Sequence, residues 1–237
     1  MTDLIDTTEM YLRTILELEE EGIPPLRARI VERLEHSGPT VSQTVGRMER
    51  DGLVHVGDDR RLQLTEQGRE LAVSVLRKHR LAERLLADVI GLDWAYVHDE
   101  ACRWEHVMSD RVEQRLLEIL DDPATTPYGT PIPPRPDKAT AAEWSASMGL
   151  SERSLLDAVR EADHGRVRVS SLAEAVQADA ELLEELFRAH VRPGVLLDVR
   201  ETADAGYLRV QAVDVEDAPA LELGRESAAH VRVAEGG

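Results

Sequence analysis

The sequence predicts a mainly α-helical protein with small β parts, divided into three successive segments. Apolar residues recur at helical spacing in residues 7–50 and again in 65–120, and two short β-prone runs lie between these stretches. A proline-rich stretch then separates the helices from a last third that holds short alternating apolar runs. At 237 residues, the chain is long enough for two or three small domains, each with a core.

The first 50 residues have the pattern of a helix-turn-helix. One helix is expected to begin at the capping-box-like residues 6–9 and to end before Gly22, and a shorter helix follows at about 26–34. Ser37-Gly38-Pro39 then interrupts the pattern, and the proline suits the first turn of a third helix, 40–50. Two β-prone runs, 53–56 and 61–64, flank a Gly-Asp-Asp-Arg turn. A hairpin directly after such helices predicts a winged helix.

The third helix carries the expected contacts to DNA, because the N-terminal residues of that helix meet base edges in this motif. Gln43 can pair with adenine through two hydrogen bonds, and Pro39 offers an apolar surface to a thymine methyl group. No acidic residue between positions 37 and 44 repels the phosphates. The alternative is a winged helix that binds protein, in which these residues only cap and solvate the helix. The residues expected to contact DNA are Arg27, Ser37, Pro39, Thr40, Ser42, Gln43, Thr44, Arg47, Arg50 and Arg60.

Composition limits where nucleic acid can bind. The formal net charge is −18, and the acidic excess is concentrated in the C-terminal two thirds. DNA must therefore meet the near-neutral N-terminal third. No apolar run is long enough to span a bilayer, and the N-terminus lacks the pattern of a signal peptide, so we expect a cytoplasmic protein without membrane contact. Cys102 is the only cysteine, which indicates a reduced ligand or nucleophile.

Potential metal ligands gather in the second helical stretch. A helix expected over 65–90 carries His79 and Glu83 one turn apart, and a helix expected over 93–108 carries the others. Taken singly, such residues are commonly structural or part of a solvated helical face. Together, imidazole, thiol and carboxylate groups predict a site for a late divalent transition metal. The ligands on the expected helix 93–108 are His98, Cys102, Glu105 and His106.

An enzyme is the competing interpretation of the same residues. Cys102 could act as a nucleophile with His106 as its base, as in a thiol- or metal-dependent hydrolase. The chain contains no glycine-rich phosphate loop, no nucleophile elbow and no His-Glu-x-x-His motif. We therefore expect a protein that is not an enzyme.

The C-terminal part is expected to form a small β-rich barrel. Six prolines between positions 123 and 138 favour an extended linker and a domain boundary there. Beyond it, short alternating runs predict strands at 167–169, 195–199, 208–210 and 230–233, with one helix near 181–189.

Three runs of the chain, 6–15, 37–45 and 98–108, resemble the iron-dependent regulators of the diphtheria toxin repressor family, and the resemblance extends to about Pro133. It implies a winged-helix DNA-binding domain in 1–73, a metal-binding and dimerisation domain with the proline-rich linker in 74–140, and an SH3-like β-barrel in 148–237. It also implies a homodimeric transcriptional repressor of iron acquisition and homeostasis genes, bound to a palindromic operator. Fe2+ is the implied corepressor, and Mn2+, Co2+, Ni2+ and Zn2+ can substitute in vitro.

The resemblance also assigns ligands one by one. A primary, activating site is implied at Met10, Cys102, Glu105 and His106. An ancillary site is implied at His79, Glu83, His98, Glu174 and Gln177. An anion site is implied at Arg80 and Thr126, where Thr126 and Thr130 occupy positions that commonly hold serine and asparagine.

Two properties of the residues themselves agree with the resemblance. Met10 is far in sequence from Cys102, so a metal that binds both must fix the N-terminal helix against the second helical segment. The thiolate and thioether favour an iron-like metal, whereas a carboxylate in place of Cys102 would suit a manganese-responsive regulator, which is the alternative function.

Overall fold

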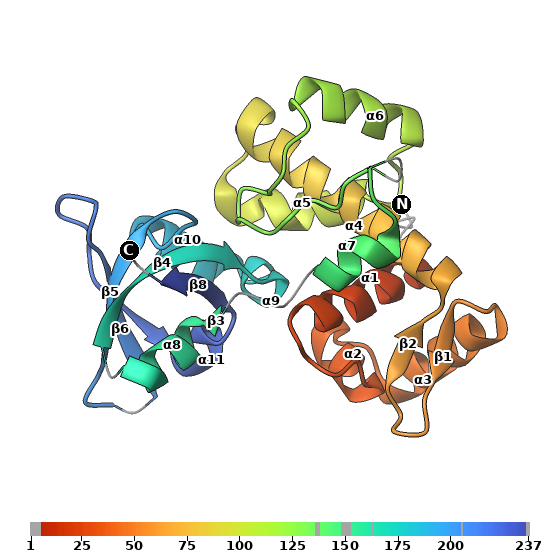
Figure 1. Ribbon diagram of the computed structural model, residues 1–237, viewed down its shortest axis with the longest axis horizontal. Coiled ribbons are helices and arrows are strands. Elements are labelled where there is room, and N and C mark those ends of the chain that lie inside the picture. The colour runs from red at the N-terminus through yellow and green to blue at the C-terminus, as the bar shows by residue number, and fades with distance from the viewer. Residues whose placement is uncertain (1–5, 136–137, 148–152, 163, 205, 236–237) are drawn as a thin grey trace. The chain divides into compact units, whose positions relative to one another are not determined.

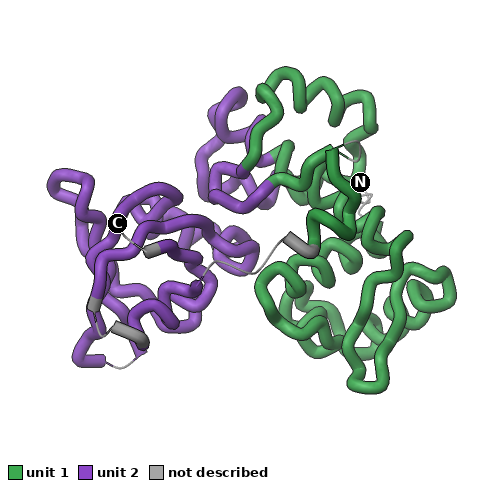
Figure 2. Tube along the Cα trace, in the orientation of Figure 1, with its two compact units in different colours: residues 1–82, 101–124, 132–150 green, residues 83–100, 125–131, 151–237 purple. Residues whose placement is uncertain are grey.

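The computed structural model describes residues 6–135, 138–147, 153–162, 164–204 and 206–235 (Figure 1). The chain divides into two compact units, each built from segments that are not consecutive in sequence (Figure 2). The mainly α-helical fold class with small β parts is confirmed. Among the described residues, no helix combines the length and apolarity that crossing a membrane requires. Unit 1 comprises residues 1–82, 101–124 and 132–150, and unit 2 comprises 83–100, 125–131 and 151–237.

The predicted helix-turn-helix is confirmed in unit 1. Helix α1 (Thr7–Glu20) begins at Asp6, whose carboxylate accepts the backbone N–H groups of Thr8 and Glu9. Helix α2 (Arg27–Leu34) is followed by α3 (Gly38–Arg50), which Ser37 caps through its hydroxyl. Strands β1 (Val54–Val56) and β2 (Leu62–Leu64) pair antiparallel and form the predicted hairpin.

These elements share one hydrophobic core. Each apolar side chain removed from water contributes about 1.5–3 kcal/mol, so this core provides much of the stability of the fold. Gly68, at the start of the next helix, lies so close to the end of α3 and β1 that a Cβ atom there would meet the carbonyl oxygen of Leu53 at 2.0 Å. The fully buried core members include Tyr11, Leu12, Ile15, Leu16, Ile30, Val41, Val45 and Met48.

The predicted long helix 65–90 differs from the structure in its last turns. Helix α4 (Glu66–Arg84) is α-helical, but Leu85–Ile90 form a wider π-helical segment, η1. Gly91, with φ +73°, ends it, and the N–H of Leu92 bonds to the carbonyl of Leu86 at 2.9 Å. Apolar spacing does not distinguish a π turn from an α turn, because both keep one face apolar over so short a stretch.

The prediction of one helix over 93–108 is wrong. A 3₁₀ turn, η2 (Trp94–Tyr96), precedes α5 (Val97–Trp104), and residues 105–107 form a turn. The N–H groups of Val107 and Met108 both bond to the carbonyl of Trp104. The chain must turn here because Ser109 caps the next helix, α6 (Asp110–Ile119), through its hydroxyl.

The proline-rich segment is not the extended linker that its composition predicts. Residues 125–131 form a closed loop in which the N–H of Thr126 bonds to the carbonyl of Thr130 at 2.9 Å. Tyr128 at its tip is fully buried, and Gly129 adopts φ +84°. This part of the segment therefore folds back on itself around a buried aromatic side chain. Residues 136–137 lie outside the described residues.

A short helix, α7 (Ala141–Ser147), completes unit 1. Trp144 is 6% exposed and belongs to the same hydrophobic core as α1 and α3. The segment that follows the proline-rich loop is therefore part of unit 1's packing.

The predicted β-rich C-terminal part is confirmed as a six-stranded antiparallel sheet of unit 2, in the order β3-β8-β4-β5-β6-β7. The four predicted runs correspond to β4, β5, β6 and β8, and the predicted helix is α10. The sequence analysis missed β3 and β7, which are two and four residues long. The expected domain start at 148 lies outside the described residues. The elements are β3 (Arg153–Ser154), α8 (Leu155–Ala162), β4 (His164–Leu172), α9 (Glu174–Gln177), α10 (Ala180–Arg188), β5 (Leu196–Glu201), β6 (Tyr207–Ala212), β7 (Leu221–Gly224), α11 (Arg225–Ala228) and β8 (Val231–Glu235).

Candidate metal centre

In unit 1, three elements bring the polar side chains of His79, Cys102 and Glu105 to one place, which we call the unit 1 cluster. His79 comes from α4, Cys102 from the end of α5, and Glu105 from the turn that follows it. His79 Nδ1 lies 2.7 Å from Glu105 Oε2, and the donor atoms of His79 and Cys102 are within 4.8 Å of one another. His79 and Glu105 are 0% and 2% exposed. The turn at 105–107 thus directs Glu105 into the unit although the helix has already ended.

Helix α1 contributes two charged residues that the sequence analysis did not select. Glu9 pairs with His106, whose Nδ1 is 2.8 Å from the Glu9 carboxylate, and His106 Nε2 is 3.2 Å from Glu105. Arg13 donates to Glu105 at 2.5 Å and to His79 at 2.8 Å. The signal was available in principle, since both residues flank Met10 within one turn of helix on either side.

The predicted primary-site residues are placed unequally. His106 Nε2 lies 3.2 Å from Glu105 Oε1, Arg13 contacts both Glu105 and Cys102, and Met10 lies beside Glu9, partly buried against the core of unit 1. The role of Met10 as a ligand stays a prediction.

The charge of Glu105 depends on its neighbours. Burial alone would raise the pKa of this carboxyl group, but the guanidinium of Arg13, together with His79 and His106, holds the pKa of Glu105 below its ordinary value. The side chain is therefore a carboxylate at neutral pH, which is the form that binds a metal.

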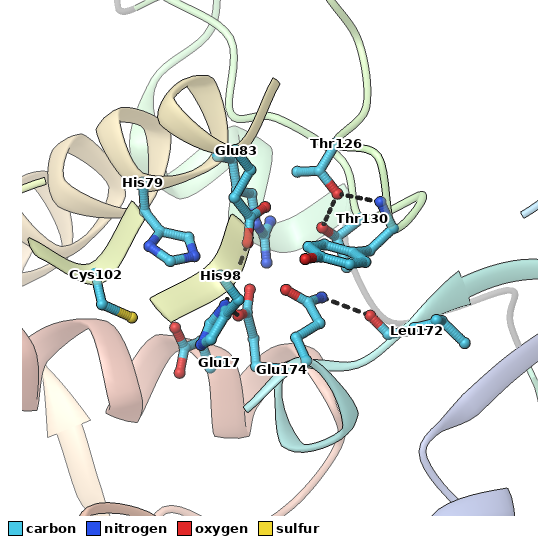
Figure 3. Close-up of polar contacts among 12 residues, drawn as sticks. Glu17, His79, Glu83, His98, Cys102, Thr126, Thr130, Leu172 and Glu174 are labelled. Carbon is cyan, nitrogen blue, oxygen red and sulfur yellow. Dashed lines mark hydrogen bonds and ion pairs between the residues drawn. The ribbon is translucent and has the colours of Figure 1, made fainter. Parts of the chain in front are cut away.

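A second cluster, the unit 2 cluster, consists of Glu83, His98 and Glu174 (Figure 3). His98 Nδ1 is 3.2 Å from Glu83 and 3.3 Å from Glu174 Oε2, and donor atoms of all three residues lie within 4.8 Å of one another. Each is at most 6% exposed. Glu83 follows His79 by four residues on α4, so the predicted pairing of these two on one helical face is confirmed. Two carboxylates around one imidazole offer oxygen and nitrogen donors without sulfur.

Gln177 supplies the sharpest test of whether this second cluster fits a metal. It follows Glu174 by three residues on α9 and is 1% exposed. Its Nε2 donates to the carbonyl of Leu172 at 2.6 Å (Figure 3), but among the described residues its Oε1 meets no hydrogen-bond donor. A buried amide oxygen left without a partner costs about 1–3 kcal/mol, which a cation would offset. The residues present fit a bound metal ion.

Aromatic residues position this part of unit 2. The Tyr128 hydroxyl donates to the carbonyl of Trp94 at 2.7 Å, and the carbonyl of Tyr128 accepts the N–H of Leu172 at 2.9 Å. The rings of Trp94 and Phe187 lie 5.6 Å apart. Burial, and then the nearby Glu83, raise the pKa of Tyr128, so its hydroxyl stays a donor. These contacts tie β4 and α10 to the segment that carries His98.

The residues predicted for an anion have other described partners. Arg80 is 1% exposed and pairs with Glu20 at 2.7 Å. The Thr126 hydroxyl bonds to the Thr130 hydroxyl at 2.8 Å and accepts the N–H of Tyr128 at 3.1 Å (Figure 3). The anion site stays a prediction.

Eight of the ten predicted DNA-contacting residues are exposed, and two are not. Arg27 is partly buried, and Thr44 is only 7% exposed, so its side chain faces the core. Arg60 lies at the turn of the hairpin, with φ +66°. The exposed members are Ser37, Pro39, Thr40, Ser42, Gln43, Arg47, Arg50 and Arg60.

A buried tyrosine connects α1 with the start of α3. The Tyr11 hydroxyl is 2.8 Å from His36 Nδ1, and the two rings lie 5.7 Å apart. His36 directly precedes Ser37, the N-cap of α3. Tyr11 therefore links α1 to the residue that precedes the N-cap of the helix expected in the major groove.

The chain matches the descriptions of two protein-family domains. Residues 3–62 match the description "Iron dependent repressor, N-terminal DNA binding domain", and residues 65–134 match "Iron dependent repressor, metal binding and dimerisation domain". The two matches together span both helical stretches.

Individual relatives agree with this match. The chain is 58% identical over 202 residues to the diphtheria toxin repressor of Corynebacterium efficiens. The matched region covers 84% of this chain and 85% of the relative. It is 55% identical over 206 residues to the iron-dependent repressor IdeR of Mycobacterium tuberculosis, covering 87% and 89%. Among solved structures, a manganese-dependent transcriptional repressor in complex with manganese is 27% identical, with a TM-score of 0.81 over 97% of this chain and 100% of that chain.

Proposed function

We propose, since this chain belongs to the iron-dependent repressor family, that it is a transcriptional repressor which binds DNA when a divalent iron-like metal is bound. Its proposed targets are iron acquisition and homeostasis genes with a palindromic operator. The proposed corepressor is Fe2+, and its primary site consists of Met10, Cys102, Glu105 and His106.

One observation carries the proposal. The unit 1 cluster joins α1 to the chain around Cys102, through the pairs Glu9–His106 and Arg13–Glu105. Helix α1 is also the element whose Tyr11 contacts the turn before α3. Helix α1 therefore contacts both the predicted metal ligands and the residue that precedes the N-cap of the DNA-reading helix.

The chain's own residues explain how such a site would act. Cys102, Glu105 and His106 would hold the ion, which supplies a divalent centre that thiolate, carboxylate and imidazole share. Met10 would link these residues to α1, and Tyr11 would pass the position of α1 to His36 and Ser37. A ligand that prefers one arrangement stabilises it by RT ln(1 + [L]/Kd), about 2.7 kcal/mol at a hundredfold excess over Kd.

The ancillary site is proposed at the second cluster. Glu83, His98 and Glu174, with the amide oxygen of Gln177, offer only oxygen and nitrogen donors. His79, one turn before Glu83, is the remaining proposed member. The β-rich segment would then strengthen metal binding without being needed for DNA binding itself.

Three domains are proposed as the working division: a winged-helix domain in 1–73, a metal-binding and dimerisation domain in 74–140, and an SH3-like domain in 148–237. A homodimer would present two α3 helices to the two halves of a palindrome. The dimerisation part of the family match supports this arrangement. The anion-binding role of Arg80 and Thr126, and the absence of catalysis by Cys102 and His106, belong to the same proposal.

The decisive experiment measures DNA binding as a function of metal. Purified protein is titrated with Fe2+ under anaerobic conditions and then mixed with genomic DNA fragments. Binding that appears with Fe2+ and disappears on chelation supports the proposal, whereas equally tight binding after chelation contradicts it. Turnover of a thioester or peptide substrate without DNA binding would favour the hydrolase.

Two variants test the placement of α3. Gln43→Ala should cost ~1–3 kcal/mol at one symmetric base pair, because it removes a base contact. Arg50→Ala should weaken binding to all sequences and lower the salt slope by about one, because it removes a phosphate contact. A binding-site selection in which Gln43→Ala keeps the wild-type base preference would show that α3 is placed differently.

The manganese-responsive alternative is tested at one side chain. Cys102→Asp replaces a soft thiolate with a hard carboxylate and should shift the metal preference toward Mn2+. If the wild-type protein already responds to Mn2+ at lower concentrations than to Fe2+, the alternative is correct.

A further inference from the structure

The guanidinium of Arg13 lies among the donor atoms of unit 1. Arg13 is 7% exposed on α1. Its Nη1 lies 2.5 Å from Glu105 Oε2 and 2.8 Å from His79 Nδ1. Its Nη1 and Nη2 lie 3.7 Å and 3.6 Å from Cys102 Sγ. One cationic side chain therefore contacts a carboxylate, an imidazole and a thiol, all of which are predicted ligands.

A second cation cannot share this position. Arginine keeps its charge at every physiological pH, so its guanidinium is a permanent cation among these donors. In a buried, weakly screened environment two cations a few ångströms apart repel strongly. An ion ligated by Cys102 and Glu105 must therefore displace the Nη groups.

Arg13 has another anionic partner to which it can turn. Its Nε lies 2.9 Å from Glu17 Oε1, one turn further along α1, and Glu17 is 3% exposed. Glu17 is not among the predicted ligands. The side chain can therefore keep one ion pair while its Nη atoms leave Glu105 and Cys102.

We propose that Arg13 competes with the metal for Glu105. The guanidinium of Arg13 neutralises Glu105 when no ion is bound and moves away when an ion enters. The inference rests on the proposed function only in taking Cys102 and Glu105 as metal ligands. Because the binding-competent arrangement is populated only when Arg13 has moved, the apparent Kd is the intrinsic Kd divided by the competent fraction. Arg13 thus raises the metal concentration at which the protein responds.

The test uses Arg13→Met, which keeps the length and packing of the side chain and removes its charge. Co2+ is titrated into the full-length protein, with affinity measured by competition against a chelating indicator and ligation followed by visible absorption. We expect the Co2+ affinity to rise ~10-fold, corresponding to a tenfold larger competent fraction. The melting temperature without metal should fall, because Glu105 loses its cationic partner.

Two further variants separate competition from a general structural effect. Arg69→Met removes another arginine that holds a carboxylate of α1, Glu19, at 2.8 Å but lies outside the cluster. It should lower the melting temperature and leave the Co2+ affinity unchanged. Glu17→Gln weakens a carboxylate on which Arg13 depends more strongly once its Nη groups have left Glu105, and it should therefore lower the Co2+ affinity about threefold.

The outcomes decide the proposal. Arg13→Met with unchanged or weaker Co2+ affinity would overturn it, since Arg13 would then be neutral or would organise the ligands. If Arg13→Met does not fold, Glu17→Gln decides the question. An unchanged Co2+ affinity in Glu17→Gln would overturn the proposal as well. Because the readout is Co2+ affinity, a protein that binds Co2+ but no operator would contradict the proposed function and leave this inference standing.

Discussion

The two clusters differ in what they join and in which atoms they offer. The unit 1 cluster contains sulfur and connects α1 with Cys102 and the turn after α5, whereas the unit 2 cluster has only oxygen and nitrogen donors and connects α9 with His98. Helix α1 contacts the start of α3, while α9 belongs to the β-rich segment. The comparison teaches that similar ligand chemistry has different consequences according to the element that carries it. The unit 1 cluster should switch DNA binding, and the unit 2 cluster should tune it.

The largest expected effect comes from removing the sulfur of the unit 1 cluster. Cys102→Ala should reduce operator affinity at saturating Fe2+ to the value without metal, a loss of ~100-fold when the wild-type protein is at a hundredfold its Kd. His106→Ala should cause the same loss of operator affinity. Fluorescence anisotropy with labelled operator measures both. Glu184→Ala, at an exposed carboxylate of α10, is the control, and full Fe2+-dependent binding by Cys102→Ala would break the comparison.

The corresponding change in unit 2 should be smaller and graded. Glu174→Ala combined with Gln177→Ala should raise the Fe2+ concentration at half-maximal DNA binding ~10-fold, in the usual range of coupling between two sites. Binding at saturating metal should remain, because the unit 1 cluster is intact. Glu181→Ala, at an exposed position on the next helix, is the control. Complete loss of binding in a folded double variant would show that the unit 2 cluster also acts as a switch.

The connection from α1 to α3 can be tested without touching a ligand. Tyr11→Phe removes the hydroxyl that bonds to His36 and should weaken operator binding at saturating metal about fivefold, equivalent to about 1 kcal/mol for one hydrogen bond. Metal affinity should not change, as measured by Co2+ titration. Tyr96→Phe, at a tyrosine that is 49% exposed, is the control. An equal change in metal affinity would place Tyr11 in the metal site and not in the connection.

The smallest expected effect concerns the aromatic contacts of unit 2. Phe187→Ala removes the ring that faces Trp94 and should raise the half-maximal metal concentration about twofold, since such a pair contributes ~0.5–1.5 kcal/mol. Tyr207→Ala, at a residue with similar exposure on β6, is the matched control. If both variants behave like the wild-type protein, these aromatic contacts do not position α9 for metal binding.

The local patterns of the chain determined most of its elements. Capping at Asp6 and Ser37, the break at Pro39 and the polar hairpin turn predict α1, α3 and the β1–β2 hairpin, because each depends on neighbours within a few residues. The donor types also predict a transition metal, since ligand chemistry belongs to the side chains themselves.

Only the tertiary structure decided the details that depend on distant contacts. Helix α5 ends at Trp104 and the proline-rich loop is ordered around Tyr128, although local pattern favours a longer helix and an extended linker. The placement of Arg13 among the donors and the burial of Thr44 arise from packing between segments far apart in sequence. Sequence determined which donors are present, because side-chain chemistry is local; packing determined which cation meets them, because charge pairing in a buried space depends on three-dimensional proximity.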